Sequence, residues 1–349
     1  MLRFAFVIFP RSVLRTAHLS LSILCALVAL AANALADSRF EALPLTRTRQ
    51  NHMLVRAFIN DKPALLIVDT GSPGTVIASK RCSYFGVGKI PRNSDLPARV
   101  QVNGSYNRLV MARSLRLGGL NVSDVPAVAV DLSGARKTAR ALHEVEADGI
   151  LGADVLFATR AVLDCQKQLL VLDQQPEMPG TAPGMDYHGF EKMPIVVSEG
   201  YNLYVDGSVN GSPARMMIDT GAFATLLHRP FVRHLRIPTE ETQLQSAAIN
   251  LKQEGIDIAR IRKLSFGLVN ITGKDVGVVD LGGVLHDGLQ NKPPTVGLLG
   301  AEILRRNHGI IDFGTRTFYL RGEAAASRKR STTRRARVTQ TLSQRLLPD

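Results

Sequence analysis

Two short acidic segments of the sequence carry residues whose types and spacing suit the catalysis of hydrolysis. Residues 65–77 read LLIVDTGSPGTVI and residues 215–228 read RMMIDTGAFATLLH. In each segment an aspartate, Asp69 or Asp219, ends an apolar run and begins an Asp-Thr-Gly turn. One such triplet arises by chance about once in a few thousand positions at average residue usage. Two such triplets in register within a longer repeat indicate that the two aspartates have a common role.

Two carboxyl groups held close together can act as acid and base in one reaction. Ionising both is costly, so the pair shares a proton, and one pKa rises while the other falls. The charged carboxylate can take a proton from a water molecule while the neutral carboxyl donates one to a substrate carbonyl. This chemistry requires neither a metal ion nor a covalent intermediate, and we expect no cofactor.

The sequence is duplicated along most of its length, with a shift of about 149 positions. INDKPALLIVDTG matches VNGSPARMMIDTG, and DGILGADVL from Asp148 matches VGLLGAEIL from Val296. Two related lobes that meet about a pseudo-twofold axis would bring Asp69 and Asp219 face to face. The duplication therefore explains why one chain needs two acidic turns.

Short strands must position these turns. Aromatic residues make up 5% of the chain, tryptophan is absent, and Val, Leu, Ile, Gly and Pro are plentiful, which favours strands joined by tight turns. In each half, a strand and a tight turn lead to the acidic turn, and hairpin strands follow before a glycine turn opens a short helix. We expect a mostly β protein.

On these motifs the sequence resembles the aspartic proteases, both retropepsin-like and pepsin-like, over most of residues 40–322. In that family the triplet continues with Ser or Ala, here Ser72 and Ala222. A hydrophobic-hydrophobic-Gly element packs behind each active loop, and this sequence has Ile150-Leu151-Gly152 and Leu298-Leu299-Gly300 at those positions. The resemblance implies a bilobal acid-protease fold, built from two related retropepsin-like β-barrel lobes with pseudo-twofold symmetry.

The resemblance also assigns roles to residues. It implies an aspartic endopeptidase that hydrolyses polypeptides, with Asp69 and Asp219 as its catalytic residues. Thr70 and Thr220 would hydrogen-bond across the lobe interface and hold the loops. The glycines that follow them, Gly71 and Gly221, would let backbone approach the shared water.

The two triplets differ in the residue that follows them. A Ser72 hydroxyl can donate a hydrogen bond to the neighbouring carboxylate and favour its charged form, whereas Ala222 cannot. We therefore expect Asp69 to ionise first, with Ser72 as the cause.

The segment ARVQVNGSYNRLVMA contains an Asn103-Gly104 turn between alternating runs, a strong hairpin signal. It falls where the family has the flap that closes over substrate, and Tyr106 near its tip could cover the carboxyl pair. A plain surface tyrosine is an equal alternative. Gln253-Glu254-Gly255 in the second half is either a second flap or a surface hairpin.

The acidic turns have other interpretations. An aspartate in a turn can simply accept backbone hydrogen bonds, but this leaves the matching Leu-Gly elements unexplained. A phosphotransferase of the actin and sugar-kinase type needs additional glycines to cradle phosphate, and neither triplet supplies them. A non-catalytic peptide- or envelope-binding protein on the same duplicated lobe stays open. Two intact triplets argue against it, because facing carboxylates repel.

The ends of the chain indicate export. Basic residues precede the apolar run 19–30, and Ala34-Leu35-Ala36 offers a cleavage site; an N-terminal membrane anchor is the alternative. We expect a periplasmic or secreted protein with five parts. These are a signal peptide (1–36), an N-terminal lobe (37–176), a linker (177–194), a C-terminal lobe (195–322) and a basic disordered tail (323–349).

The net charge of +13 is concentrated at the ends, because residues 328–349 hold seven basic side chains and one acid. This basic composition suits a tail that contacts an envelope or membrane surface, and it equally suits a solvated tail without a role. The proposed chemistry requires no nucleic acid. Cys82 and Cys165 are either buried apolar residues or one optional disulfide. Because both acidic turns lie in one chain joined by a short linker, we expect a monomer.

Overall fold

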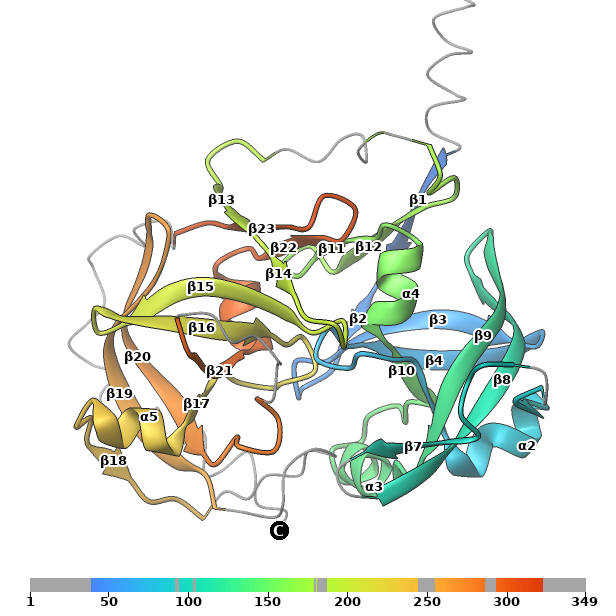
Figure 1. The fold of residues 1–349 in the computed structure, drawn as a ribbon, viewed down its shortest axis with the longest axis horizontal. Helices are drawn as coiled ribbons and strands as arrows, with labels where there is room; N and C mark the ends of the chain where they lie inside the picture. Colours follow the sequence, from blue (N-terminus) through green and yellow to red (C-terminus); the bar gives the residue numbers. More distant parts are fainter. Residues whose placement is uncertain are drawn as a thin grey trace, which may run out of the picture.

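Each half of the duplication closes into its own β-barrel. The structure is a computed structural model that describes residues 39–91, 94–102, 105–178, 180, 187–243, 255–285 and 293–322. The chain is mostly β, and its two six-stranded barrels lie beside each other in Figure 1, the first half in blue and green and the second in yellow and orange. This confirms the bilobal acid-protease fold expected from the sequence.

A two-residue hairpin turn starts each barrel. Asn60 and Asp61 in the first half, and Asn210 and Gly211 in the second, all have positive φ. Positive φ at both central residues matches the right-handed twist of the flanking strands. The same turn in both halves sets the register of the strand that leads to each acidic turn.

The N-terminal barrel closes in the order β3-β4-β10-β5-β9-β8, because β8 pairs back onto β3. Strands β2, β6 and β7 extend this sheet at its edges. Its strands are β2 (Thr46–Arg47), β3 (Met53–Ile59), β4 (Lys62–Val68), β5 (Val76–Ala78), β6 (Gly88–Lys89), β7 (Arg99–Val102), β8 (Ser105–Leu117), β9 (Leu120–Val130) and β10 (Gly149–Leu151).

The C-terminal barrel repeats this topology in the order β15-β16-β21-β17-β20-β19, with β19 pairing back onto β15. The duplication seen in the sequence is therefore preserved strand by strand. Its strands are β14 (Val196–Val197), β15 (Leu203–Val209), β16 (Ser212–Ile218), β17 (Leu226–His228), β18 (Thr239–Glu240), β19 (Asp257–Phe266), β20 (Val269–Val279) and β21 (Thr295–Leu299).

A six-stranded sheet joins the two lobes, and it lies across the top of the molecule in Figure 1. Its central pair is β11 against β22, one strand from each half, with Leu163 opposite Ile311 in the sheet and both side chains fully buried. The strands, in sheet order, are β1 (Phe40–Pro44), β12 (Leu169–Asp173), β11 (Val162–Asp164), β22 (Ile310–Asp312), β23 (Thr317–Leu320) and β13 (Glu191–Pro194).

Strand β13 lies inside the segment expected to be a linker, residues 177–194. Its four residues pair with β23 of the second half, so the end of that segment belongs to the interlobe sheet. The Pro and Gly content that suggested a linker is concentrated before this strand.

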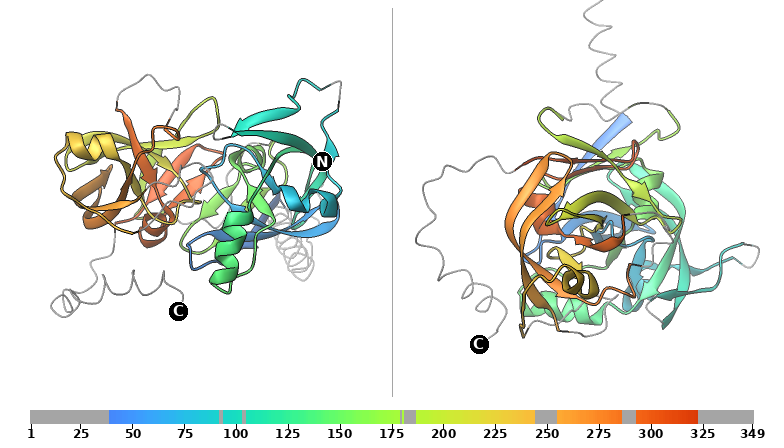
Figure 2. Two further views of the ribbon diagram at one scale, coloured as in Figure 1. Left: turned by 90° about the horizontal axis from the view of Figure 1, so that it is seen from below. Right: turned by 60° about the vertical axis from the view of Figure 1, so that its left-hand side comes forward.

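The helices are short, and several occupy equivalent positions in the two halves. One helix follows each Leu-Gly element directly, and a second follows β5 or β17. Figure 2 shows the two barrels from two further directions. The helices are η1 (Ser79–Arg81), α2 (Cys82–Phe85), α3 (Ser133–Ala141), α4 (Ala153–Ala158), α5 (Arg229–His234) and α6 (Ala301–Arg306).

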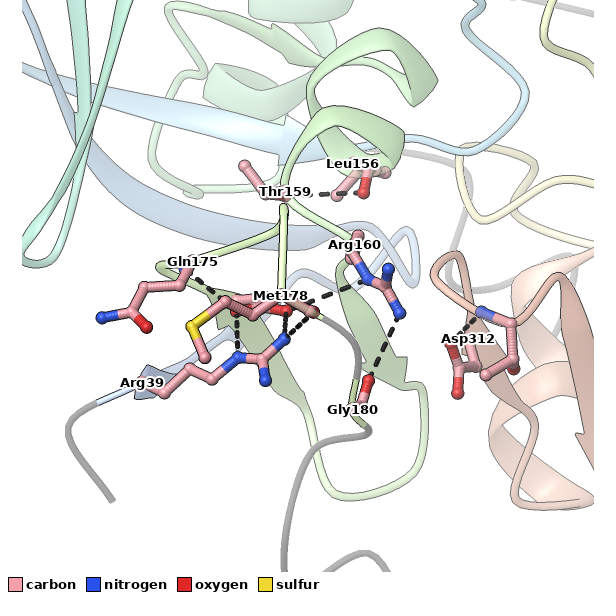
Figure 3. Close-up of polar contacts among 10 residues, drawn as sticks. Arg39, Leu156, Thr159, Arg160, Gln175, Met178, Gly180 and Asp312 are labelled. Atoms are coloured by element: carbon pink, nitrogen blue, oxygen red, sulfur yellow. Dashed lines mark hydrogen bonds and ion pairs between the residues drawn. The ribbon is translucent and has the colours of Figure 1, made fainter. Parts of the chain in front are cut away.

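The start of the described chain is tied to the end of the first lobe. The Arg39 guanidinium makes two hydrogen bonds, of 2.9 and 2.8 Å, to the carboxylate of Asp173 at the end of β12. It also donates to the carbonyl of Met178, and Arg160 donates to the carbonyl of Gly180 at 3.3 Å (Figure 3). Two arginines thus hold the chain where it leaves the first lobe.

Both cysteines in the described part of the chain are buried and free. Cys82 and Cys165 therefore form no disulfide, and their buried apolar role is the one observed. Burial raises the pKa of the Cys165 thiol to about 12, which keeps it a neutral thiol.

Among the described residues, no helix is long and apolar enough to cross a membrane.

Candidate active site

Equivalent buried strands deliver the two acidic residues. Strand β4 ends at Val68 and β16 ends at Ile218, both fully buried, and the next residue in each case is the aspartate. The N–H of Asp69 donates to Leu151 of β10 and that of Asp219 donates to Leu299 of β21, each at 3.1 Å. Each aspartate therefore leaves its barrel at a position set by a parallel strand pair.

The threonines of the two triplets lock the loops to each other. The N–H of Thr70 donates to Oγ1 of Thr220 at 3.0 Å, and the reciprocal bond measures 3.1 Å. Each hydroxyl then donates to a carbonyl of the opposite lobe, Thr70 to Ile218 at 2.7 Å and Thr220 to Val68 at 2.8 Å. Both side chains are fully buried, so these four bonds hold the two acidic turns at one place.

The two carboxyl groups face each other across this interface. A Cβ added to Gly71 would lie 2.5 Å from Cγ of Asp219, and one added to Gly221 would lie 2.4 Å from Cγ of Asp69. Each carboxyl thus packs over the glycine of the other loop. Only glycine leaves space for this crossed arrangement.

The backbone around the pair is less symmetric. Asp69 Oδ1 accepts the N–H of Gly71 at 2.9 Å, whereas Asp219 Oδ1 accepts the N–H groups of both Gly221 and Ala222, each at 2.9 Å. Burial raises the pKa of both carboxyls. The pKa of Asp219 is raised further by the charge of Asp69. A pair of this kind holds one proton over a range of pH, and Asp219 is the member that keeps it.

The expected role of Ser72 is wrong. Its hydroxyl donates to the carbonyl of Gly74 at 2.8 Å, within its own turn, rather than to the carboxylate of Asp69. Its N–H approaches the backbone carbonyl of Asp69 at 3.4 Å. The pKa of Asp69 is raised less than that of Asp219, but this difference has another origin, because Ser72 donates no hydrogen bond to the Asp69 carboxylate.

The Leu-Gly elements lie directly behind the active loops. A Cβ on Gly152 would approach the carbonyl carbon of Gly74 to 2.4 Å, and one on Gly300 would approach that of Ala224 to 2.3 Å. The segments are in backbone contact, and only glycine permits it.

An acidic residue on the following helix fastens each loop, a role that the sequence analysis does not assign. Asp154 on α4 accepts the N–H and the hydroxyl of Thr75, at 2.9 and 2.8 Å. Glu302 on α6 accepts the N–H of Thr225 at 2.9 Å. The acid stands at the same place in both repeats, in GAD and GAE, so the repeat itself was the signal. Burial raises the pKa of Asp154, although the bonds from Thr75 oppose this.

A histidine that the sequence analysis did not select reaches the second loop from the first lobe. Nε2 of His52 lies 3.0 Å from the carbonyl oxygen of Gly221, and the amide of Asn51 donates to the carbonyl of Phe223 at 3.3 Å. The equivalent of His52 in the second repeat is Asn202. Because the repeat is broken at this position, no motif pointed to it.

The expected flap is a hairpin whose tip, Asn103 and Gly104, lies outside the described residues. Strands β7 and β8 flank it, with Val102 paired to Ser105. Tyr106 lies on β8 beside the tip and is 71% exposed. Gln253 and Glu254 of the second candidate flap also lie outside the described residues. Within the described part of the chain, no cluster of three or more His, Cys, Asp or Glu side chains could hold a metal ion.

A comparison with known protein families matches both halves of the chain. A family model described as aspartyl protease matches residues 55–155 and 205–303, one segment in each repeat and together more than half of the chain. The chain belongs to the aspartyl protease family. No curated protein matches the chain. The crystal structure of basic 7S globulin from soybean is similar to it at 10% identity and a TM-score of 0.44, covering 81% of this chain and 95% of that one.

Proposed function

We propose that this member of the aspartyl protease family is an endopeptidase that hydrolyses peptide bonds with a carboxyl pair, one carboxyl from each lobe. The observation that carries the proposal is the crossed packing of Asp69 and Asp219 over Gly221 and Gly71. Facing carboxylates are costly to bury. A pair without a chemical task would gain stability by losing one of them.

The two carboxyls divide the work by their protonation. Asp69, the more acidic of the two, is the base that takes a proton from the attacking water. Asp219 keeps its proton and donates it to the carbonyl oxygen of the substrate as the water oxygen bonds to the carbonyl carbon. Oδ1 of Asp219 already accepts two N–H groups, so the acidic proton belongs on Oδ2.

The surrounding bonds keep this geometry ready before substrate arrives. The four threonine hydrogen bonds and the acidic residues behind the loops support both turns. Preorganised groups avoid reorganisation during the reaction. Because both carboxyls come from one chain, we propose that the monomer is active and that its substrate is a polypeptide lying between the lobes.

The proposal is tested by digesting a denatured protein between pH 4 and 7 with the wild type and with Asp69→Asn and Asp219→Asn. Either substitution should abolish turnover, because the pair then lacks its base or its acid. Circular dichroism and a thermal melt show whether the variants stay folded.

Two results would overturn this function. Turnover that survives in either variant would mean that the carboxyls do not act as a pair. A wild-type protein that binds unfolded polypeptide but never cleaves it across this range would instead be a non-catalytic peptide-binding protein on the same fold.

A further inference from the structure

One peptide group of the second active loop is hydrogen-bonded at both ends. The peptide between Gly221 and Ala222 has its carbonyl oxygen 3.0 Å from Nε2 of His52. Its N–H donates to Oδ1 of Asp219 at 2.9 Å. Hydrogen bonds in such a chain polarise one another, so a donor at the carbonyl strengthens the N–H at the other end. His52 is thus linked to the carboxyl of Asp219 through a single amide.

The turn that carries His52 is itself well held. The N–H of His52 donates to Oγ1 of Thr48 at 3.1 Å, and the N–H of Thr48 donates to the His52 carbonyl at 2.9 Å. Asn51 lies in the left-handed region at φ 61°, and Arg47 donates to its carbonyl at 3.0 Å. These hydrogen bonds close the turn and hold the imidazole at a fixed position. A residue that positions another group must itself be held in place.

We propose that His52 is a positioning residue for Asp219: its Nε2–H holds the Gly221 carbonyl and, through the Gly221–Ala222 peptide, orients and strengthens the N–H that Asp219 Oδ1 accepts. Only the effect of His52 on catalytic rate rests on the proposed function; its effect on the pKa of Asp219 does not. The amide of Asn51 on the carbonyl of Phe223 secures the same loop one residue beyond Ala222.

The two halves are asymmetric at this point. In the first loop the N–H of Ser72 approaches a backbone carbonyl, and not a carboxyl oxygen. In the described part of the chain, no hydrogen bond joins the side chain of Asn202, the counterpart of His52, to the first loop. The hydrogen-bonded tie from His52, through the Gly221–Ala222 peptide, therefore reaches Asp219 and not Asp69. The N–H groups of Gly221 and Ala222 favour the ionised form of the deeply buried Asp219 carboxyl.

The charges that face His52 come from its own lobe. Asp69 follows β4 and Glu144 follows helix α3; both favour the imidazolium, as does the Gly221 carbonyl from the opposite lobe. Burial outweighs them and lowers the pKa of His52. Since Nε2 faces a carbonyl oxygen, it carries a hydrogen in the neutral and in the charged ring alike, so the tie persists across the titration of His52.

The test compares His52→Ala with His52→Gln, whose side-chain amide can still offer a donor near the Nε2 position. Aspartate labelled with ¹³C at the carboxyl carbon reports the titration by NMR, and Asp219→Asn identifies the signal of Asp219. In His52→Ala the upper pKa of the pair should rise by about 0.5, because the Ala222 N–H stabilises ionised Asp219 less. His52→Gln should return this pKa toward the wild-type value, and Asn202→Ala should leave it unchanged.

The kinetic readout follows the same logic. His52→Ala should lower kcat about tenfold with KM within about twofold, and the alkaline limb of its pH–rate profile should move upward. If His52→Ala does not fold, His52→Asn replaces it, since this shorter side chain does not reach Gly221 and is the residue of the second repeat.

Named outcomes separate this inference from the proposed function. An unchanged upper pKa in folded His52→Ala, or a His52→Gln variant that behaves like His52→Ala, would overturn the tie while proteolysis by the wild type stands. A shifted carboxyl titration in a protein that never cleaves polypeptide would support the tie and defeat the protease assignment.

Discussion

The carboxyl of Asp219 packs directly on the α-carbon of Gly71, so that a Cβ at Gly71 would fall 2.5 Å from both Cγ and Oδ1 of Asp219. Asp69 stands in the same relation to Gly221. Each acidic turn therefore provides the floor on which the carboxyl of the opposite turn rests. The glycine backbone of each turn therefore sets how closely the opposite carboxyl can approach.

Gly71→Ala should displace the carboxyl of Asp219 and lower kcat/KM on a denatured protein substrate by about 100-fold, the size of effect that a displacement of roughly 1 Å produces. Gly134→Ala is the matched control, because nothing lies within 4 Å of the added methyl group. A Gly71→Ala enzyme with full activity would show that the carboxyls do not depend on this contact.

Thr70→Val should destabilise the protein by about 3 kcal/mol, since it leaves the Ile218 carbonyl and the Thr220 N–H buried without their partner. Thr70→Ser keeps the hydroxyl and should cost much less. Urea unfolding of the three proteins measures the difference. Equal losses for Val and Ser would mean that the methyl group, and not the hydrogen bonds, stabilises the interface.

The pH–rate profile should be bell-shaped, because activity needs one proton on the carboxyl pair. As pH falls, protonation of Asp69 ends activity; as pH rises, loss of the Asp219 proton ends it. Burial and the charge of Asp69 raise the pKa of Asp219 well above 3.8, so the alkaline limb should lie well above that value. Asp154→Asn removes another buried carboxyl with a raised pKa; an alkaline limb that disappears in this variant would reassign it to Asp154.

Asp173→Asn should lower stability near neutral pH but not in strong acid. Burial alone would raise the pKa of Asp173, but hydrogen bonds from Arg39 and the Gln175 N–H, with the charges of Arg39 and Arg160, lower it below 3.8. A carboxyl whose pKa is lowered by folding stabilises the protein above its unfolded pKa, and this contribution is lost as pH falls through the folded pKa.

Free energies of unfolding between pH 7 and 2 measure the contribution of Asp173. The difference between wild type and Asp173→Asn should be full above pH 5 and vanish below the lowered pKa. Asp275→Asn, in the exposed pair with Arg260, is the control and should change stability little at any pH. A difference for Asp173→Asn that persists unchanged to pH 2 would contradict the ion-pair origin.

Much of the site was predictable because its residues lie in short sequence motifs that occur in both repeats. An apolar strand followed by Asp-Thr-Gly, a hairpin turn with residues that accept positive φ, and a glycine that packs behind the loop are all local patterns. The duplication then required the two turns to meet. For the same reason, the acids behind the loops, Asp154 and Glu302, were recognisable in principle from their matched positions.

The sequence by itself determined the fold class, the duplication and the identity of the two facing aspartates, since strand periodicity, turn chemistry and repetition act over a few neighbouring residues. Only the tertiary structure decided which partner each polar group takes. Ser72 bonds within its own turn and His52 crosses to the other lobe, because hydrogen bonds form with whatever lies within about 3 Å in space. Separation along the chain contains no information about that distance.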